Sequence, residues 1–106
     1  MASEKKTTSF HDLINGNTPV LIDFYADWCG PCKAFAPQLQ RFKEQMGDRV
    51  RVVKIDVDKN QQIASALKVQ SIPTVMIFQQ GELKYRQAGA PPIRDLAAKI
   101  EELAAA

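Results

Sequence analysis

Residues 20–26 (VLIDFYA) constrain the fold more than any other segment, because they are mostly β-branched or aromatic and carry a single charge. Seven residues suit a strand, and a strand that is apolar on both faces is typical of the interior of a parallel sheet. Such a strand needs a layer of helices above it and another below it. The segment therefore predicts the α/β fold class.

The remaining segments predict those helices and the other strands. From Pro31 to about Met46, apolar residues recur at helical spacing, and Gly47 is a natural stop. The other expected elements are helices over 9–14, 61–67 and 93–103, and strands over 50–57, 74–78 and 83–87, the last two joined as an antiparallel hairpin through Gln80-Gly81-Glu82. This order predicts a parallel βαβ unit continued by a hairpin, which gives a mixed central sheet flanked by helices on both faces, in three layers.

Length and charge limit the domain organisation and the kinds of partner. The chain has 106 residues and no linker-like stretch, so one domain over 1–106 is expected. Its 14 basic and 12 acidic side chains are interspersed, without the cationic cluster that phosphate binding favours, so nucleic acid is not an expected partner. No apolar run approaches the roughly 20 residues that cross a bilayer, and the polar segment 1–8 lacks a signal-peptide core. We therefore expect a cytoplasmic protein with no membrane partner, most simply a monomer.

The two cysteines lie in Trp28-Cys29-Gly30-Pro31-Cys32, where the first buried strand leads into a helix. Cys29 is expected at the amino end of that helix, where unpaired N–H groups and the helix dipole favour a thiolate. Cys32, one turn further on, is near enough to resolve a mixed disulfide within the same molecule. Pro31 suits the first helical turn, and Gly30 leaves the approach to Cys29 open. The pattern predicts thiol–disulfide exchange.

Three other interpretations of the cysteines are less economical. A structural disulfide would close too short a loop to restrict the unfolded chain much. A zinc site needs four ligands, and the chain adds only His11, far away in the sequence, so no metal is expected. If the two cysteines were inert buried thiols, nothing would explain why they lie at a helix start with Gly and Pro between them.

From about Phe10 to Leu103 the sequence resembles the thioredoxin family. The resemblance rests on Phe24–Lys33 (FYADWCGPCK), on Ser71-Ile72-Pro73-Thr74, and on Gly89 ahead of the last helix. It implies a thioredoxin fold in which Cys29 is the attacking thiol and Cys32 the resolving thiol. It also implies reduction of disulfides in client proteins, with no cofactor beyond the Cys29–Cys32 disulfide and with a flavin-dependent thioredoxin reductase as the electron donor.

Asp23 is an anomaly inside an apolar strand, because a buried carboxylate is costly unless it is paired, hydrated or protonated. On pattern alone, Asp23 could equally be exposed at a sheet edge, with Lys54 a solvated surface charge. The resemblance implies instead that Asp23 lies beneath the cysteines and accepts the proton of the resolving thiol, with Lys54 as its neighbour.

The resemblance further implies a shallow surface for docking clients around Cys29. In it, Pro73 has a cis peptide bond and stands against the cysteines, so that the backbone of Ile72 can pair with an extended client segment. On pattern alone, Pro73 is an ordinary loop proline and Trp28 a core residue. The expected surface consists of Trp28, Gly30, Pro31, Ile72, Pro73, Gly89 and Ala90.

The sequence departs from the family at several positions, and two other functions stay open. The family's first strand would fall within 3–8, which is polar and short, so this edge strand is expected to be weak or lost. Tyr25 stands where many members have tryptophan, and Ser71 where glycine is common. The alternatives are a redox-independent binding or structural subunit with the same fold, and an oxidase or isomerase in an oxidising compartment.

Overall fold

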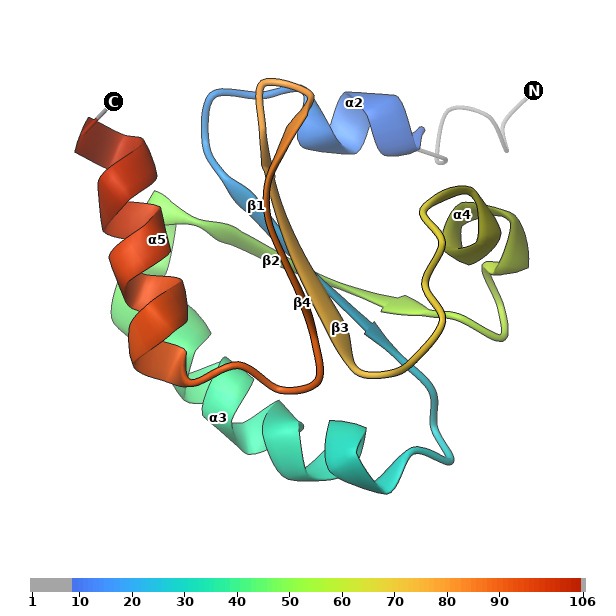
Figure 1. Cartoon of the computed structure of the whole chain (residues 1–106). Helices are drawn as coiled ribbons and strands as arrows, with labels where there is room; N and C mark the ends of the chain where they lie inside the picture. Colours follow the sequence, from blue (N-terminus) through green and yellow to red (C-terminus); the bar gives the residue numbers. More distant parts are fainter. Residues whose placement is uncertain (1–8, 106) are drawn as a thin grey trace, which may run out of the picture.

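The computed structural model describes residues 9–105, whose helices and strands follow the predicted order (Figure 1). The expected edge strand within 3–8 lies outside these residues. Between residues 9 and 105, the only element that was not predicted is the short 3₁₀ turn η1. The elements are α2 (Phe10–Ile14), β1 (Val20–Tyr25), α3 (Gly30–Met46), η1 (Gly47–Arg49), β2 (Arg51–Asp56), α4 (Gln61–Ala66), β3 (Thr74–Gln79), β4 (Glu82–Ala88) and α5 (Ile93–Ala105).

The four strands form one mixed sheet in the order β2-β1-β3-β4. β1 runs parallel to β2 and antiparallel to β3, while β3 and β4 form the predicted antiparallel hairpin. Because β1 has a strand on each side and a helical layer on each face, its residues from Val20 to Phe24 are all buried. This confirms the parallel βαβ unit followed by a hairpin, and it explains why residues 20–26 are so apolar.

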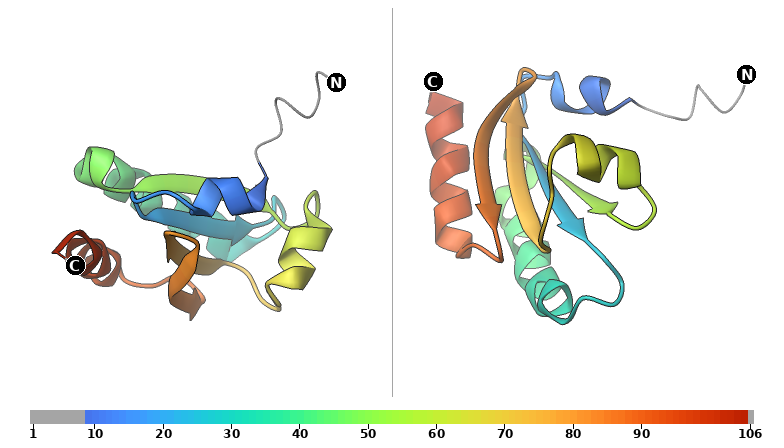
Figure 2. Two further views of the ribbon diagram at one scale, coloured as in Figure 1. Left: turned by 90° about the horizontal axis from the view of Figure 1, so that it is seen from above. Right: turned by 45° about the vertical axis from the view of Figure 1, so that its right-hand side comes forward.

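Helices cover both faces of the sheet, as expected for three layers (Figures 1 and 2). A hydrophobic core lies on each face. One core joins the sheet to α3 and α5 and contains Leu21 of β1; the other joins it to α2 and α4 and contains Ile22 and Phe24. Side chains alternate between the faces of a strand, so Asp23 points to the same face as Leu21. That face is the one covered by α3, the helix that begins at the cysteines.

None of the helices within residues 9–105 is long and apolar enough to cross a bilayer.

α4 ends in a Schellman motif with a lysine where glycine is usual. The N–H of Val69 donates to the carbonyl of Ala64 at 2.9 Å, and the N–H of Lys68 donates to that of Ser65 at 3.0 Å. Lys68 has a φ of 57°, in the left-handed region that side chains with a Cβ avoid. The end of α4 therefore carries local backbone strain.

Replacing Lys68 by glycine is expected to raise the free energy of unfolding by about 0.5–1 kcal/mol, since glycine adopts this conformation without the Cβ penalty. Urea unfolding monitored by far-UV circular dichroism measures the change. Ala66→Gly, two residues earlier and inside the helix, is the matched control and should lose about 1 kcal/mol. Equal losses at both positions would contradict the assignment of strain to Lys68.

Candidate active site

Cys29 caps the amino end of α3 and is disulfide-bonded to Cys32, one turn further along the helix. The N–H of Cys32 donates to the Cys29 Sγ at 3.1 Å, and the two Cα atoms are 5.3 Å apart. Pro31 sits in the first turn, where a helix needs no N–H from it. These positions confirm the placement predicted from the strand-to-helix junction.

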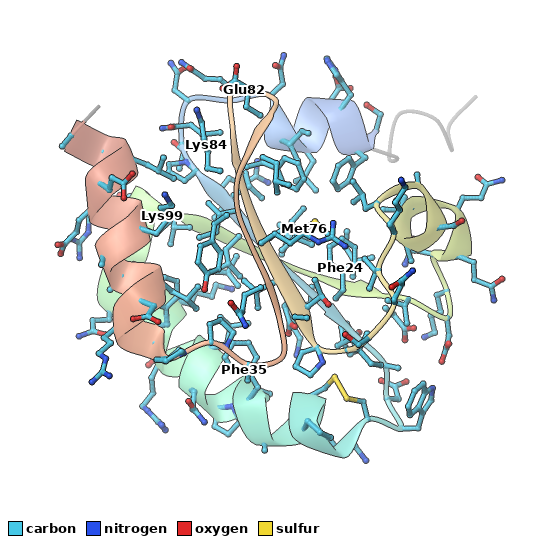
Figure 3. The ribbon with its side chains drawn as sticks, viewed as in Figure 1. Phe24, Phe35, Met76, Glu82, Lys84 and Lys99 are labelled. Carbon is cyan, nitrogen blue, oxygen red and sulfur yellow. A yellow bond between two sulfur atoms is a disulfide. The ribbon has the colours of Figure 1, made fainter. Side chains whose placement is uncertain are left out.

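The cysteine pair lies at the surface but exposes little of itself. Cys29 is 3% exposed and Cys32 5%, and both pack with Ala26 and with the partly buried Tyr25 and Ile72. The neighbouring residues Gly30 and Pro31 are exposed. Figure 3 shows the disulfide at the end of α3, away from the two cores. Only a small part of the cysteine pair is therefore open to solvent.

The segment containing Ile72 and Pro73 stands against this target, as expected. The Ile72–Pro73 peptide bond is cis, and the carbonyl oxygen of Ile72 lies 3.9 Å from the Cys29 Sγ. The carbonyl of Pro73 accepts a hydrogen bond of 2.8 Å from the N–H of Gly89, which has a φ of 88°, and the exposed Ala90 follows. The fold thus brings three separate parts of the chain together around Cys29.

Trp28 is a surface residue, and a core position is excluded because its side chain is 69% exposed. Its indole Nε1 donates to the Asp58 Oδ2 at 2.8 Å. Asp58 is itself positioned by Asp56, whose Oδ1 accepts from the Asp58 N–H at 2.8 Å. Sequence reasoning missed Asp58; the available signal was the pair of carboxylates at the end of β2, the strand parallel to β1.

Asp23 is buried, which excludes the interpretation that it is exposed at an edge. Asp23 is 1% exposed. Among the buried side-chain oxygen and nitrogen atoms of residues 9–105, only its Oδ1 has no hydrogen-bond partner. Burial raises the pKa of the Asp23 carboxyl from 3.8 to about 6, and the charge of Lys54 opposes this rise. Asp23 can therefore gain or lose a proton near neutral pH.

Lys54 lies beside Asp23 but is not in an ion pair with it. The two residues are in register across β1 and β2, and no contact between them within 4.0 Å is found among the described ion pairs. The exposed Lys54 instead places its Nζ 4.8 Å from the centroid of the Tyr25 ring, a cation–π contact. Lys54 thus acts on Asp23 only through its charge, and Tyr25, to which sequence reasoning gave no part, determines where that charge is held.

A hollow of about 150 Å³ opens beside Cys32. It lies between α3 and the strands β1 and β2. Its lining consists of Tyr25, Ala26, Asp27, Cys32, Lys33, Ala36 and Lys54.

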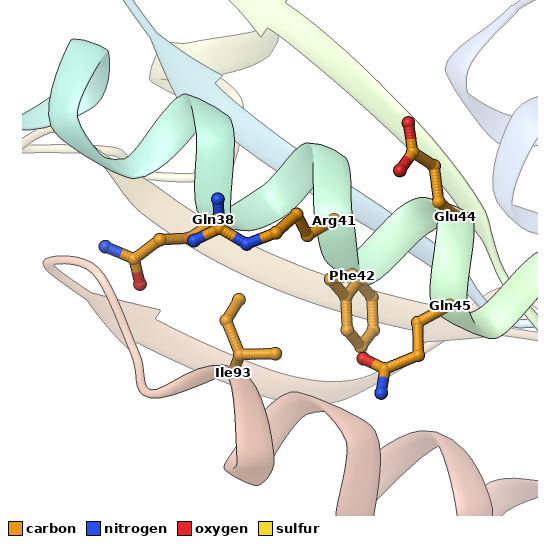
Figure 4. Close-up of a pocket in the computed structure, with 6 residues that line it drawn as sticks. All are labelled: Gln38, Arg41, Phe42, Glu44, Gln45 and Ile93. Atoms are coloured by element: carbon orange, nitrogen blue, oxygen red, sulfur yellow. The ribbon is translucent and has the colours of Figure 1, made fainter.

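A larger hollow of about 700 Å³ lies between α3 and α5 (Figure 4). It has no cysteine among its lining residues, so it lacks the nucleophile for thiol–disulfide exchange. It is lined by Gln38, Arg41, Phe42, Glu44, Gln45 and Ile93. As for metals, no cluster of three or more potential ligands occurs in the part of the chain from Ser9 to Ala105.

Comparisons with known proteins agree with this geometry. The family model described as Thioredoxin matches residues 2–102. The chain is 42% identical over 92 residues to thioredoxin of Bacillus subtilis, covering 87% of this chain and 88% of that protein. It is also 42% identical over 101 residues to the chloroplastic thioredoxin Y of Oryza sativa subsp. japonica, covering 94% of this chain and 60% of that protein. The chain thus spans about three fifths of the length of the first chloroplastic relatives.

A solved structure shows the same fold. Mitochondrial thioredoxin 3 from Saccharomyces cerevisiae, in its oxidised form, superposes with a TM-score of 0.77 at 39% identity, over 88% of this chain and 86% of that one. The expected thioredoxin fold is therefore confirmed. With a family model spanning nearly the whole sequence, relatives above 40% identity and a disulfide at the start of α3, the chain belongs to the thioredoxin family.

Proposed function

We propose that this chain is a protein thiol–disulfide oxidoreductase that reduces disulfides in client proteins, cycling Cys29 and Cys32 between dithiol and disulfide. The observation that carries the proposal is the Cys29–Cys32 disulfide at the amino end of α3, with the Ile72 carbonyl 3.9 Å from the Cys29 Sγ. Membership of the thioredoxin family supports the same activity.

The first step is attack by the Cys29 thiolate on one sulfur of a client disulfide. A Cys29–client disulfide forms, and the other client sulfur leaves as a thiolate that takes up a proton. The N–H groups at the start of α3, including that of Cys32 at 3.1 Å, favour negative charge on the Cys29 sulfur. Because this helix has 17 residues, its amino end presents a fully developed dipole.

The second step releases the client. Cys32 loses its proton and attacks the Cys29 Sγ, so the second client sulfur leaves as a thiol and the Cys29–Cys32 disulfide forms. The client gains two electrons and two protons in the complete cycle. Tethering makes this step intramolecular, which replaces a collision by a high effective concentration.

Asp23 is the proposed acceptor of the Cys32 proton, either directly or through water. Its location on the α3 face and its pKa of about 6 suit a base that works near neutral pH. Lys54 is proposed to support the ionised form of Asp23 through its charge, held in place against Tyr25.

Clients are proposed to dock around Cys29, with an extended segment pairing along the backbone of Ile72. The exposed indole of Trp28 and the exposed start of α3 supply contact area next to the sulfur. The proposed surface comprises the exposed or partly exposed residues Trp28, Gly30, Pro31, Ile72, Gly89 and Ala90, together with Pro73, which is buried.

A flavin-dependent thioredoxin reductase would restore the dithiol, and no cofactor beyond the disulfide is required. The chain would act as a single-domain monomer in the cytoplasm. The relatives named above include a bacterial and a chloroplastic protein, and both are thioredoxins.

Reduction of insulin tests the proposed function. The dithiol form should reduce insulin disulfides, and NADPH with a thioredoxin reductase should sustain turnover. Equilibration with glutathione should yield a potential more reducing than about −200 mV, below that of protein disulfide isomerase. A more oxidising potential together with inactivity on insulin would favour the oxidase or isomerase alternative.

A further inference from the structure

Arg86 connects β4 to the end of α4 by two hydrogen bonds that sequence reasoning did not anticipate. One terminal nitrogen of its guanidinium donates to the carbonyl of Leu67 at 2.7 Å, and the other donates to that of Lys68 at 2.8 Å. Within β4, Arg86 pairs with Met76 of β3, and its guanidinium lies 3.9 Å from the Met76 Sδ. The side chain therefore runs across Met76, on the face of the sheet covered by α4.

The end of α4 needs such a partner. Leu67 is the C-cap of α4 and Lys68 the strained left-handed residue that follows it, so their carbonyls accept no hydrogen bond within the helix. α4 has only six residues and no side-chain cap at its start, and a helix of that length has little stability of its own. The planar guanidinium of Arg86 donates to the two successive carbonyls, and its positive charge at the carboxyl end of the helix stabilises the helix dipole. Arg86 of β4 thus holds the carboxyl end of α4.

The segment held in this way is the one that reaches the active site (Figure 1). Ile72 is four residues beyond Lys68, and its carbonyl lies 3.9 Å from the Cys29 Sγ. The far end of the segment is pinned by the Thr74 Oγ1, which donates to the Ser71 carbonyl at 2.6 Å, and by the Gly89 N–H, which donates to the Pro73 carbonyl at 2.8 Å. The segment 69–73 is therefore fixed at both ends, by Arg86 of β4 at one end and by Gly89, the residue after β4, at the other.

We propose that Arg86 is a positioning residue for client docking, which sets the place of the Ile72 backbone by holding the carbonyls of Leu67 and Lys68. The inference rests on the proposed function and deepens it by separating two classes of substrate. An extended polypeptide that pairs with Ile72 depends on Arg86. A small disulfide has no backbone to pair, so its reduction requires only Cys29 and Cys32.

Arg86→Met tests the inference, because methionine keeps an unbranched stem over Met76 but donates no hydrogen bond. The dithiol form is assayed on insulin and on 5,5′-dithiobis(2-nitrobenzoic acid). We expect the ratio of the two rate constants, insulin over small disulfide, to fall about fivefold, which corresponds to about 1 kcal/mol. The loss should appear in KM for insulin and leave kcat little changed, since docking contacts act in the bound complex and the transition state alike.

Two further variants sharpen the test. Arg41→Met removes the same charge from an exposed position on α3. The Arg41 side chain makes no hydrogen bond within residues 9–105, so this variant should leave the ratio unchanged. Arg86→Lys keeps the charge but not the two-pronged geometry, and should give an intermediate ratio.

The ratio also separates the possible failures. Partial unfolding of Arg86→Met would lower both rate constants equally and leave their ratio unchanged. An unchanged ratio overturns the positioning role, whether or not the two rate constants fall. A parent protein that reduces neither substrate would instead refute the proposed function itself.

Discussion

Cys29→Ser is expected to lower the rate of insulin reduction by roughly 10³-fold or more, since a serine hydroxyl at this position cannot attack a disulfide at neutral pH. Cys32→Ser should behave differently, because its Cys29 still attacks but nothing resolves the product. Mixed disulfides between Cys29 and the client should then accumulate. Turbidity of reduced insulin measures the first effect, and mass spectrometry under non-reducing conditions detects the covalent adduct in the second.

The two variants control for each other, because both remove the Cys29–Cys32 disulfide and differ only in which sulfur remains. Circular dichroism should show that both keep their secondary structure. If Cys29→Ser reduced insulin at the parental rate, the proposed mechanism would be wrong. A double variant with both cysteines replaced by serine, tested by complementation in a strain that lacks the parent protein, addresses the remaining alternative: full complementation would favour a redox-independent binding subunit.

Asp23→Asn is expected to increase the free energy of unfolding by about 3 kcal/mol at pH 8. Burial raises the pKa of the folded-state carboxyl from 3.8 to about 6, and each unit corresponds to about 1.4 kcal/mol. Below about pH 4 the carboxyl is protonated in both the folded and the unfolded protein, so burial adds no ionisation penalty there. As the pH rises from about 4 to about 6, the unfolded protein ionises Asp23 freely, whereas the folded protein must bury the charge. The free energy of unfolding of the parent protein therefore falls over this range.

The gain from Asp23→Asn should therefore shrink between pH 6 and pH 4 and vanish below about pH 4. Urea unfolding of the oxidised protein at a series of pH values measures this profile. Asp48→Asn, at an exposed aspartate of η1, is the matched control and should leave the profile of the parent protein unchanged. A gain of equal size at pH 3.5 and pH 8 would show that packing, rather than ionisation, is the source.

Local patterns in the sequence determined the α/β class, the order of the elements and the position of the cysteines. Residues 20–26 were predicted as a strand, which the structure has as Val20–Tyr25, and the helix predicted over 31–46 runs over Gly30–Met46. These predictions succeed because periodicity, caps and turns act between residues a few positions apart. The helix-start position of Cys29 depends on the same short-range rules, so the centre of the active site could be placed from the sequence.

The surroundings of the cysteines could be placed only in part. The resemblance correctly predicted that Ile72 and Pro73 stand against Cys29. The expectation that Lys54 neighbours Asp23 holds across the strands, but the ammonium lies over Tyr25 and makes no ion pair with that acid. A register of strands states which residues are adjacent, whereas the direction of a long side chain depends on what else packs there.

Only the tertiary structure decided the strand order β2-β1-β3-β4, the support of Trp28 by Asp58 and the hold of Arg86 on the end of α4. Trp28 and Asp58 are 30 positions apart, and Arg86 lies 19 and 18 positions from its two acceptors. Such contacts form only when the sheet has brought distant segments together. No short stretch of sequence predicts them. The sequence by itself therefore placed the cysteine pair at the start of a helix, and the assembled sheet determined what surrounds it.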